Sequence, residues 1–228
     1  ISQQINPQQL AKINCWIFDL DNSLYHPRAD IFGQIDVKMC EYIQKLLACD
    51  KVEANRIQKR YFHDHGTTLA GLMHHHKIEP RSFLDFVHAV DLQALSPDQE
   101  LRAGLSKLGG RRIIFTNGDK DYAVRVLQAL GIDDLFEDIQ DIVAGNYHPK
   151  PQKIAYDLLV KALAIAPETA LFVEDMAQNL KPAKQMGMTT VWLNNGSERG
   201  DHLASPNWID CEIKDLNQWL TAITALCL

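Results

Sequence analysis

Two aspartates directly after a short apolar run constrain this chain more than any other feature of its sequence. Residues 13–20 predict a buried strand, and Asp19 and Asp21 lie at its carboxyl end. Side chains two residues apart lie on the same side of a strand, so the two carboxylates start on one side. The active-site crevice of an open α/β sheet lies outside the carboxyl ends of its strands. The pair therefore indicates chemistry, with one acid able to bind a metal or attack an electrophile and the other able to move a proton.

Apolar segments alternate with helical segments over the second half of the chain. Strands are predicted at residues 111–115, 139–144, 169–173 and 189–193, and helices at 98–108, 122–130, 151–163 and 177–186. Apolar strands that alternate with helices are typical of a parallel sheet covered on both faces. The expected fold class is therefore α/β, with a three-layer core around a parallel sheet.

Residues 27–90 have an almost entirely helical pattern, which sets them apart from the sheet. Apolar residues recur at helical spacing after Ile31, Gly66 interrupts the pattern, Thr67 is an N-cap candidate and Pro80 begins another helix. We expect residues 25–96 to form a helical domain inserted after strand one. Residues 1–24 and 97–228 would then form the α/β core.

Polar residues follow the later strands as well, and a lysine lies between two of these positions. They are Thr116, Asn117, Lys150, Glu174 and Asp175. The carboxyl ends of parallel strands meet at one edge of a sheet, so these side chains are expected to converge. Their chemistry suits phosphoryl transfer: carboxylates bind Mg²⁺, a hydroxyl and an ammonium bind phosphate, and an aspartate can form an aspartyl-phosphate.

The segment Asp19-Leu20-Asp21-Asn22-Ser23, together with these later residues, resembles the four motifs of the haloacid dehalogenase-like (HAD) hydrolases. The motifs occur in the family's order over nearly the whole chain. The resemblance implies a Rossmann-like core, and the helical insert resembles the family's C1 cap. Ser23 stands where the family usually has threonine, and because the hydroxyl is kept we expect little loss.

The resemblance also implies a role for each motif residue. Asp19 attacks phosphorus, and Asp21 protonates the leaving oxygen and then activates the water that hydrolyses the aspartyl-phosphate. Thr116 and Asn117 bind the transferring phosphoryl group. Lys150 steadies Asp19 and the phosphate charge.

Mg²⁺ is the cofactor that the resemblance implies. It would be bound by the Asp19 carboxylate, the Asp21 backbone carbonyl and Asp175, with Glu174 acting largely through water. We also expect Asn179, four residues after Asp175, to orient that acid.

Asp21 separates two branches of the family. The dehalogenases attack carbon and lack this second acid, since a halide leaving group needs no proton whereas an alkoxide does. The sequence therefore favours a phosphatase over a 2-haloacid dehalogenase. A non-enzymatic phosphate-accepting domain is a further alternative, but such domains are shorter and have no large helical insert after strand one.

Residues 19–25, 61–72 and 115–118 are similar to the pyrimidine 5'-nucleotidase-like branch. This similarity implies hydrolysis of a pyrimidine nucleoside monophosphate, with a phosphatase for phosphoglycolate or a sugar phosphate as the alternative. His63, His65 and Thr67 are the cap residues expected to contact substrate. His74-His75-His76 instead predicts a solvated helix end, because adjacent residues of a helix point in different directions.

The composition of the chain limits the classes of partner and substrate that it is expected to bind. The net charge of -6 and pI of about 5.8 disfavour a nucleic-acid polymer as partner. No apolar run approaches the roughly 18–20 residues that span a bilayer. The five cysteines have no CxxC spacing, which favours reduced thiols. We expect a cytoplasmic enzyme, monomer or homodimer, that acts on a small phosphomonoester without a membrane.

Overall fold

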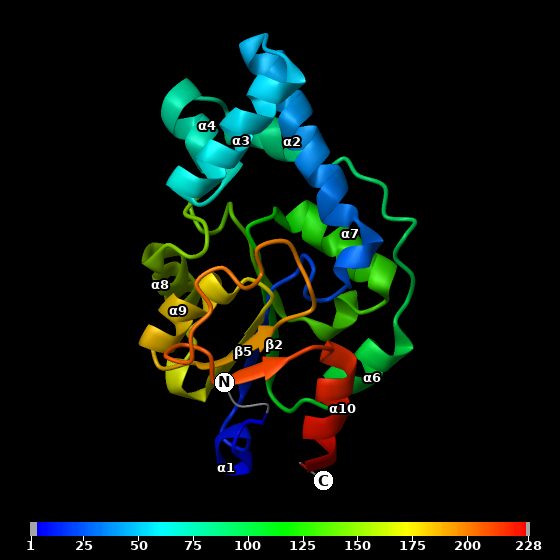
Figure 1. Ribbon diagram of the computed structural model, residues 1–228. Helices are drawn as coiled ribbons and strands as arrows, with labels where there is room; N and C mark the ends of the chain where they lie inside the picture. Colours follow the sequence, from blue (N-terminus) through cyan, green and yellow to red (C-terminus); the bar gives the residue numbers. More distant parts are fainter. Residues whose placement is uncertain (1–3, 227–228) are drawn as a thin grey trace.

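A single parallel sheet lies at the centre of the computed structural model, which describes residues 4–226 (Figure 1). Within these residues six strands pair in the order β3-β2-β1-β4-β5-β6, all parallel to their neighbours. The strands are β1 (Cys15–Phe18), β2 (Arg111–Phe115), β3 (Asp138–Gln140), β4 (Ala170–Glu174), β5 (Thr189–Leu193) and β6 (Cys211–Ile213). The order reverses direction beside β1, which is where open α/β sheets form their binding crevice.

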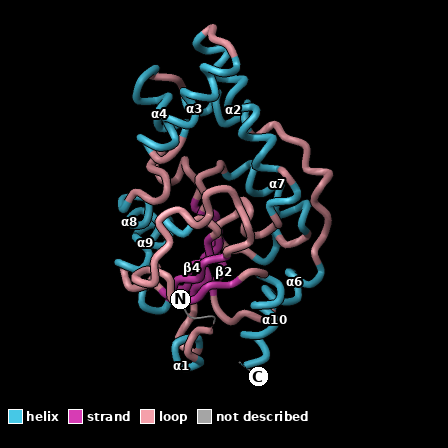
Figure 2. Tube along the Cα trace, viewed as in Figure 1, coloured by secondary structure: helices cyan, strands magenta, loops and turns pink. Residues whose placement is uncertain are grey.

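Helices cover both faces of the sheet, with the strands between two helical layers (Figure 2). One face packs against α6 (Gln99–Ser106), α7 (Lys120–Leu130) and α10 (Leu216–Leu226), and the other against α8 (Lys153–Ala162) and α9 (Ala177–Gln185). Neighbouring residues of β1 divide between the faces: Phe18 belongs to the first apolar cluster and Ile17 to the second. This alternation explains why the strands are apolar throughout, and it confirms the predicted three-layer α/β fold.

The helical insert after β1 contains α2 (Ile31–Leu47), α3 (Lys51–His65), α4 (Thr68–His76) and α5 (Pro80–Val87). In Figure 1 most of it stands above the carboxyl ends of the strands. Gly66 ends α3 with a φ of 86°, and the Thr67 Oγ1 accepts a hydrogen bond from the Ala70 N–H at the start of α4. The predicted break, N-cap and proline start are thus confirmed. The domain limits at 24/25 and 96/97 stay a prediction.

Several predicted bounds were wrong. Strand β3 ends at Gln140 rather than at residue 144, because the Asp141 Oδ1 accepts the Ala144 N–H and closes a turn. Helix α8 begins at Lys153, so Pro151 precedes the helix instead of forming its first turn. The segments α1 (Pro7–Leu10), β6 and α10 were missed. Among the described residues, no helix combines the length and apolar character that crossing a membrane requires.

Candidate active site

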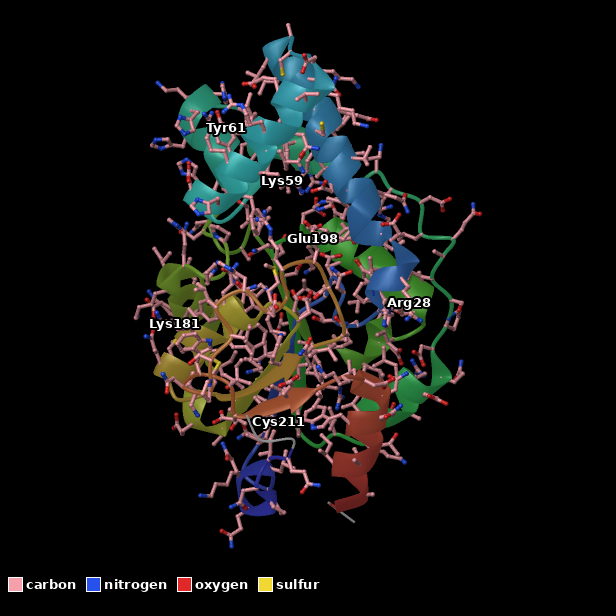
Figure 3. All side chains as sticks on the ribbon, viewed as in Figure 1. Arg28, Lys59, Tyr61, Lys181, Glu198 and Cys211 are labelled. Atoms are coloured by element: carbon pink, nitrogen blue, oxygen red, sulfur yellow. The ribbon has the colours of Figure 1, made fainter. Side chains whose placement is uncertain are left out.

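A cavity of about 190 Å³ lies where the helical insert meets the carboxyl ends of the strands. Figure 3 shows Lys59 of α3 and Glu198 of the loop after β5 on the two sides of this space, and both residues line the cavity. All the core residues that the sequence singled out also line it: Asp19, Asp21, Thr116, Asn117, Lys150, Glu174 and Asp175. Strand ends far apart in the sequence thus form one site.

The Lys150 ammonium organises the floor of the cavity. Its Nζ donates to the Asp19 Oδ1 at 2.6 Å, the Glu174 Oε2 at 2.7 Å and the Phe115 backbone oxygen at 2.8 Å. All three N–H donors of the ammonium are therefore used inside the protein. The second Asp19 oxygen, Oδ2, accepts from the Ser23 hydroxyl at 2.9 Å. Ser23 thus supplies the hydroxyl that the motif calls for, and it holds the Asp19 carboxylate in one orientation.

Glu174 is held from three sides. Its Oε2 accepts from Lys150 and, at 3.1 Å, from the Asn179 Nδ2, while its Oε1 accepts from the Met176 N–H. The sequence predicted that Asn179 orients Asp175, and this prediction was wrong. The first turn of α9 instead brings the amide to Glu174. The Asn179 Oδ1 is buried without a hydrogen-bond partner among the described residues, which leaves an acceptor free beside the carboxylates.

Three buried carboxylates lie close to the Lys150 ammonium. Ligand oxygens of Asp19, Glu174 and Asp175 lie within 4.8 Å of one another. When all three carboxylates are ionised, the group including Lys150 carries a net charge of about -2. Burial and then the charge of Glu174 raise the pKa of Asp19 to about 7, against the opposing effect of Lys150. Burial, followed by the charges of Glu174 and Asp19, raises the pKa of Asp175 as well.

This arrangement fits a divalent cation. Mg²⁺ prefers oxygen ligands, and a charge of +2 would balance the excess negative charge of the cluster. The Lys150 pKa is raised because Asp19 and Glu174 outweigh the effect of its burial, so the lysine stays charged while the carboxylates remain in excess. Asp19, Glu174 and Asp175 are thus the side chains able to hold the ion. The Asp21 carboxylate lies outside the cluster.

Asp21 has different surroundings from Asp19. It is half-buried, and its Oδ1 accepts hydrogen bonds from the hydroxyls of Tyr25 and Tyr122, each at 2.6 Å. The two aspartates of the motif therefore line the same cavity with different partners: Asp19 contacts the Lys150 ammonium, and Asp21 contacts two phenol hydroxyls. Sequence reasoning missed both tyrosines. The signal for Tyr25 was its position four residues after Asp21, and nothing local indicated Tyr122.

Thr116 and Asn117 connect β2 to the site. The Thr116 side chain is buried, and its Oγ1 accepts the Gly118 N–H at 2.9 Å. Asn117 brackets the Lys150 backbone: its Oδ1 accepts the Lys150 N–H at 2.8 Å and its Nδ2 donates to the Lys150 oxygen at 3.2 Å. The amide of Asn117 thus fixes the loop that delivers the lysine.

The insert supplies the opposite wall, which is mostly apolar and aromatic. Its apolar lining is Phe32, Ile35, Met39, Phe62, Leu69, Phe83, Leu84 and Val87. A polar group interrupts this wall: Gln58 donates from its Nε2 to the Asp36 backbone oxygen and Oδ1, and the Lys59 Nζ lies 2.8 Å from the same Oδ1. The Gln58 Oε1 is buried and has no hydrogen-bond partner in the described residues.

The predicted substrate contacts of the insert divide between two places. Thr67 lines the cavity around Asp19, as expected. His63 and His65 line a second groove between the insert and the core, which adjoins this cavity. Phe62 lines both the groove and the cavity. The contact of His63 and His65 with substrate stays a prediction.

The three consecutive histidines end α4, as predicted. His74 and His75 are exposed, and the half-buried His76 lies 2.8 Å from the Tyr61 hydroxyl through its Nε2. The His75 Nε2 lies 3.0 Å from the Nε2 of His65. Among the described residues the histidines form no group of three converging ligand atoms.

The fold and this cluster define a Rossmann-like α/β core whose acidic site lies at the carboxyl ends of parallel strands beneath a helical cap. A family model for haloacid dehalogenase-like hydrolases matches residues 13–187. The chain belongs to this family.

Relatives in the family include both phosphate-related proteins and dehalogenases. Phosphate metabolism protein 8 of Saccharomyces cerevisiae is 26% identical over 201 residues, which cover 80% of this chain and 61% of that protein. Haloacetate dehalogenase H-2 of Moraxella sp. (strain B) is 30% identical over 103 residues, 44% and 46% of the two chains. The chain thus spans less than two thirds of the length of these curated relatives.

Solved structures show the same fold. A predicted phosphoglycolate phosphatase from Haemophilus somnus 129PT matches with a TM-score of 0.64 at 17% identity, over 92% of this chain and 98% of that one. A HAD phosphatase from Thermococcus onnurineus matches with a TM-score of 0.62 at 20% identity and the same coverage. L-2-haloacid dehalogenase from Xanthobacter autotrophicus has a TM-score of 0.55 at 19% identity, again with that coverage.

Proposed function

We propose that this protein is a Mg²⁺-dependent phosphomonoester hydrolase that works through an aspartyl-phosphate on Asp19. The observation that carries the proposal is that Asp19 and Asp21 line the same cavity but have different hydrogen-bond partners. Asp19 lies in a buried cluster with Lys150, whereas Asp21 lies on the same cavity with two tyrosine hydroxyls. Two carboxylates in unlike surroundings suit a nucleophile and a separate proton carrier.

The reaction then has two steps. An Asp19 oxygen attacks phosphorus, the ester P–O bond breaks, and Asp21 gives its proton to the departing alkoxide. Asp21, now ionised, takes a proton from water as that water attacks the aspartyl-phosphate. The P–O bond to Asp19 breaks and inorganic phosphate leaves. Lys150, 2.6 Å from Asp19, orients the nucleophile and opposes the negative charge that gathers during both attacks.

Asp19, Glu174 and Asp175 would hold the cation. When bound, Mg²⁺ supplies positive charge that neutralises the phosphoryl oxygens and the carboxylates. The chain's own residues perform the positioning. Ser23 and Lys150 keep the Asp19 oxygens in place, and Asn179 orients Glu174.

Asp21 also argues against dehalogenation, although dehalogenases occur among the relatives. Expulsion of a halide needs no proton donor. A carboxylate on the cavity wall with two dedicated hydroxyl partners has no task in that reaction. In ester hydrolysis the same group serves both steps.

We further propose a pyrimidine nucleoside 5'-monophosphate as substrate. The insert's wall combines aromatic side chains with a buried acceptor that has no hydrogen-bond partner among the described residues, the Gln58 Oε1. Because both Asp36 partners of Gln58 are acceptors, its Nε2 must face Asp36 and its oxygen stays available. A pyrimidine ring offers flat apolar faces and an N–H at its edge. This chemistry matches the wall better than the small acid of phosphoglycolate does.

A substrate panel tests both levels of the proposal. UMP and CMP would be compared with phosphoglycolate, a sugar phosphate, p-nitrophenyl phosphate and 2-chloropropionate, with and without Mg²⁺. The expected result is Mg²⁺-dependent phosphate release, fastest from the pyrimidine nucleotides. Halide release without phosphatase activity would overturn the proposed reaction. Equal rates for all the phosphomonoesters would overturn only the substrate.

A further inference from the structure

The two phenols beside Asp21 have no assigned role. Tyr25 and Tyr122 are 6% and 0% exposed, and each donates its hydroxyl proton to the Asp21 Oδ1 at 2.6 Å. Burial, followed by the negative charge of Asp21, keeps the pKa of both phenols well above the ordinary value. Both therefore remain protonated and act as hydrogen-bond donors.

The Tyr122 ring is fixed independently of Asp21. It stacks on His88 with centroids 4.5 Å apart and an interplanar angle of 7°. The His88 Nδ1 lies 3.0 Å from the Asp119 Oδ2, and the Asp119 Oδ1 accepts the Tyr122 N–H at 2.8 Å. His88 follows directly after α5, so the end of the helical insert helps to set this hydroxyl. The position of the Tyr122 hydroxyl is thus set by these contacts as well as by its hydrogen bond to Asp21.

Both hydroxyls use the same carboxylate oxygen. No hydrogen bond to the Asp21 Oδ2 is found within the described part of the chain, although Asp21 lines the cavity. A carboxylic acid carries its proton on one oxygen and accepts hydrogen bonds on the other. An oxygen that already accepts two bonds is a poor site for the proton, so the proton belongs on Oδ2.

We propose that Tyr25 and Tyr122 are positioning residues that reserve the Asp21 Oδ2 for the proton transfer to the leaving oxygen. The proposal rests on the phosphatase function proposed above. As the ester P–O bond breaks, the proton moves from Oδ2 to the alkoxide. The negative charge left on Asp21 is stabilised at Oδ1 by the two phenols. The same bonds keep the carboxylate oriented when it takes a proton from water in the second step.

This role predicts an effect that depends on the leaving group. The test measures kcat and KM of Tyr25→Phe, Tyr122→Phe and the double variant with UMP and with p-nitrophenyl phosphate. A ribose alkoxide needs a proton as it leaves, whereas p-nitrophenolate is stable without one. We expect kcat with UMP to fall by about 10-fold or more, and clearly further than kcat with p-nitrophenyl phosphate. KM should change little.

Two controls separate positioning from a structural role. Tyr42→Phe removes a phenol hydroxyl whose hydrogen-bond partner in the described part of the chain is the exposed Ser82, and it should keep the wild-type ratio of the two rates. In an Asp21→Asn background, the tyrosine substitutions should have no additional selective effect, because the carboxylic acid they position is gone. Thermal unfolding would confirm that each variant is folded. The same selective loss is expected in each of the two single variants, so each tests the proposal independently.

The proposal is overturned by equal losses with both substrates, by no loss, or by a faster enzyme. Losses of the selective kind that persist in the Asp21→Asn background would also overturn it. If the wild-type protein hydrolyses no phosphomonoester at all, the proposed function itself fails. That outcome is recognised before any variant is measured.

Discussion

The Lys150 ammonium lies 2.6 Å from the Asp19 carboxylate, and both side chains are almost completely buried. Glu174, 2.7 Å from the same ammonium, makes the lysine the shared partner of two carboxylates. A buried charge without its partner is costly, so these residues depend on one another. The same contacts orient the Asp19 oxygen that we propose as the nucleophile.

Loss of Lys150 should therefore affect both stability and activity. In Lys150→Met at about pH 8 with EDTA, three carboxylates remain buried without a cation, and the free energy of unfolding should fall by about 3–5 kcal/mol. Turnover should fall by at least about 100-fold. Chemical denaturation and phosphate release measure the two effects. Lys153→Met is the matched control, since its pair with Asp157 is exposed, and it should change little.

Asp19→Asn should remove activity without harming the fold. The amide cannot form the aspartyl-phosphate, so phosphate release should fall by about 10⁴-fold or more. In EDTA at about pH 8, the free energy of unfolding should be equal to or above that of the wild type, because one of three crowded charges is gone. Turnover like the wild type's would rule out Asp19 as nucleophile. A large loss of stability in Asp19→Asn would contradict the charge repulsion that raises the pKa of Asp19.

The raised pKa of Asp19, about 7 against the ordinary 3.8, predicts the pH dependence of the metal-free protein. Between these values the folded state binds a proton that the unfolded chain has released. The contribution of Asp19 to stability therefore decreases as the pH rises from about 4 to 7. The difference in melting temperature between the wild type and Asp19→Asn, both in EDTA, should shift in favour of the variant over this range.

Mg²⁺ should have the opposite dependence, because it binds the ionised carboxylates. The rise in melting temperature on adding Mg²⁺ should be larger at about pH 8 than at about pH 5.5, and it should be reduced in Asp175→Asn. An equal rise at both pH values would argue against a metal site built from these three acids.

Gln58 should discriminate between substrates. Wild-type protein should prefer UMP over N3-methyl-UMP by up to about 10-fold in kcat/KM, since the methyl group removes the N–H that the Gln58 Oε1 would accept. Gln58→Met, which keeps the side-chain length, should bring that ratio close to one. Gln128→Met, on the exposed side of α7, should retain the preference. An unchanged ratio in Gln58→Met would mean that the ring edge is recognised elsewhere.

Much of the site followed from local pattern. Three short apolar runs were predicted to be strands, because a continuous apolar run is typical of a strand buried on both faces. They end at Asp19, just before Thr116, and at Glu174. Parallel strands then place their carboxyl ends together. The break at Gly66 and the cap at Thr67 were equally local, because such residues act through the backbone within a few positions.

The tertiary structure decided the partners. Asn179 bonds to Glu174 rather than to Asp175, and His63 lines only the second groove, whereas its neighbour Phe62 lines both the groove and the cavity. Tyr122 reaches Asp21 across 101 residues of chain. Hydrophobic period gives the type of each element but leaves its rotation and its distant neighbours open, because these depend on how helices pack on the sheet. The sequence alone thus determined the parallel core with its row of acids. Only the packed structure showed that, among the described residues, the tyrosine hydroxyls bind one oxygen of Asp21 and leave the other without a partner.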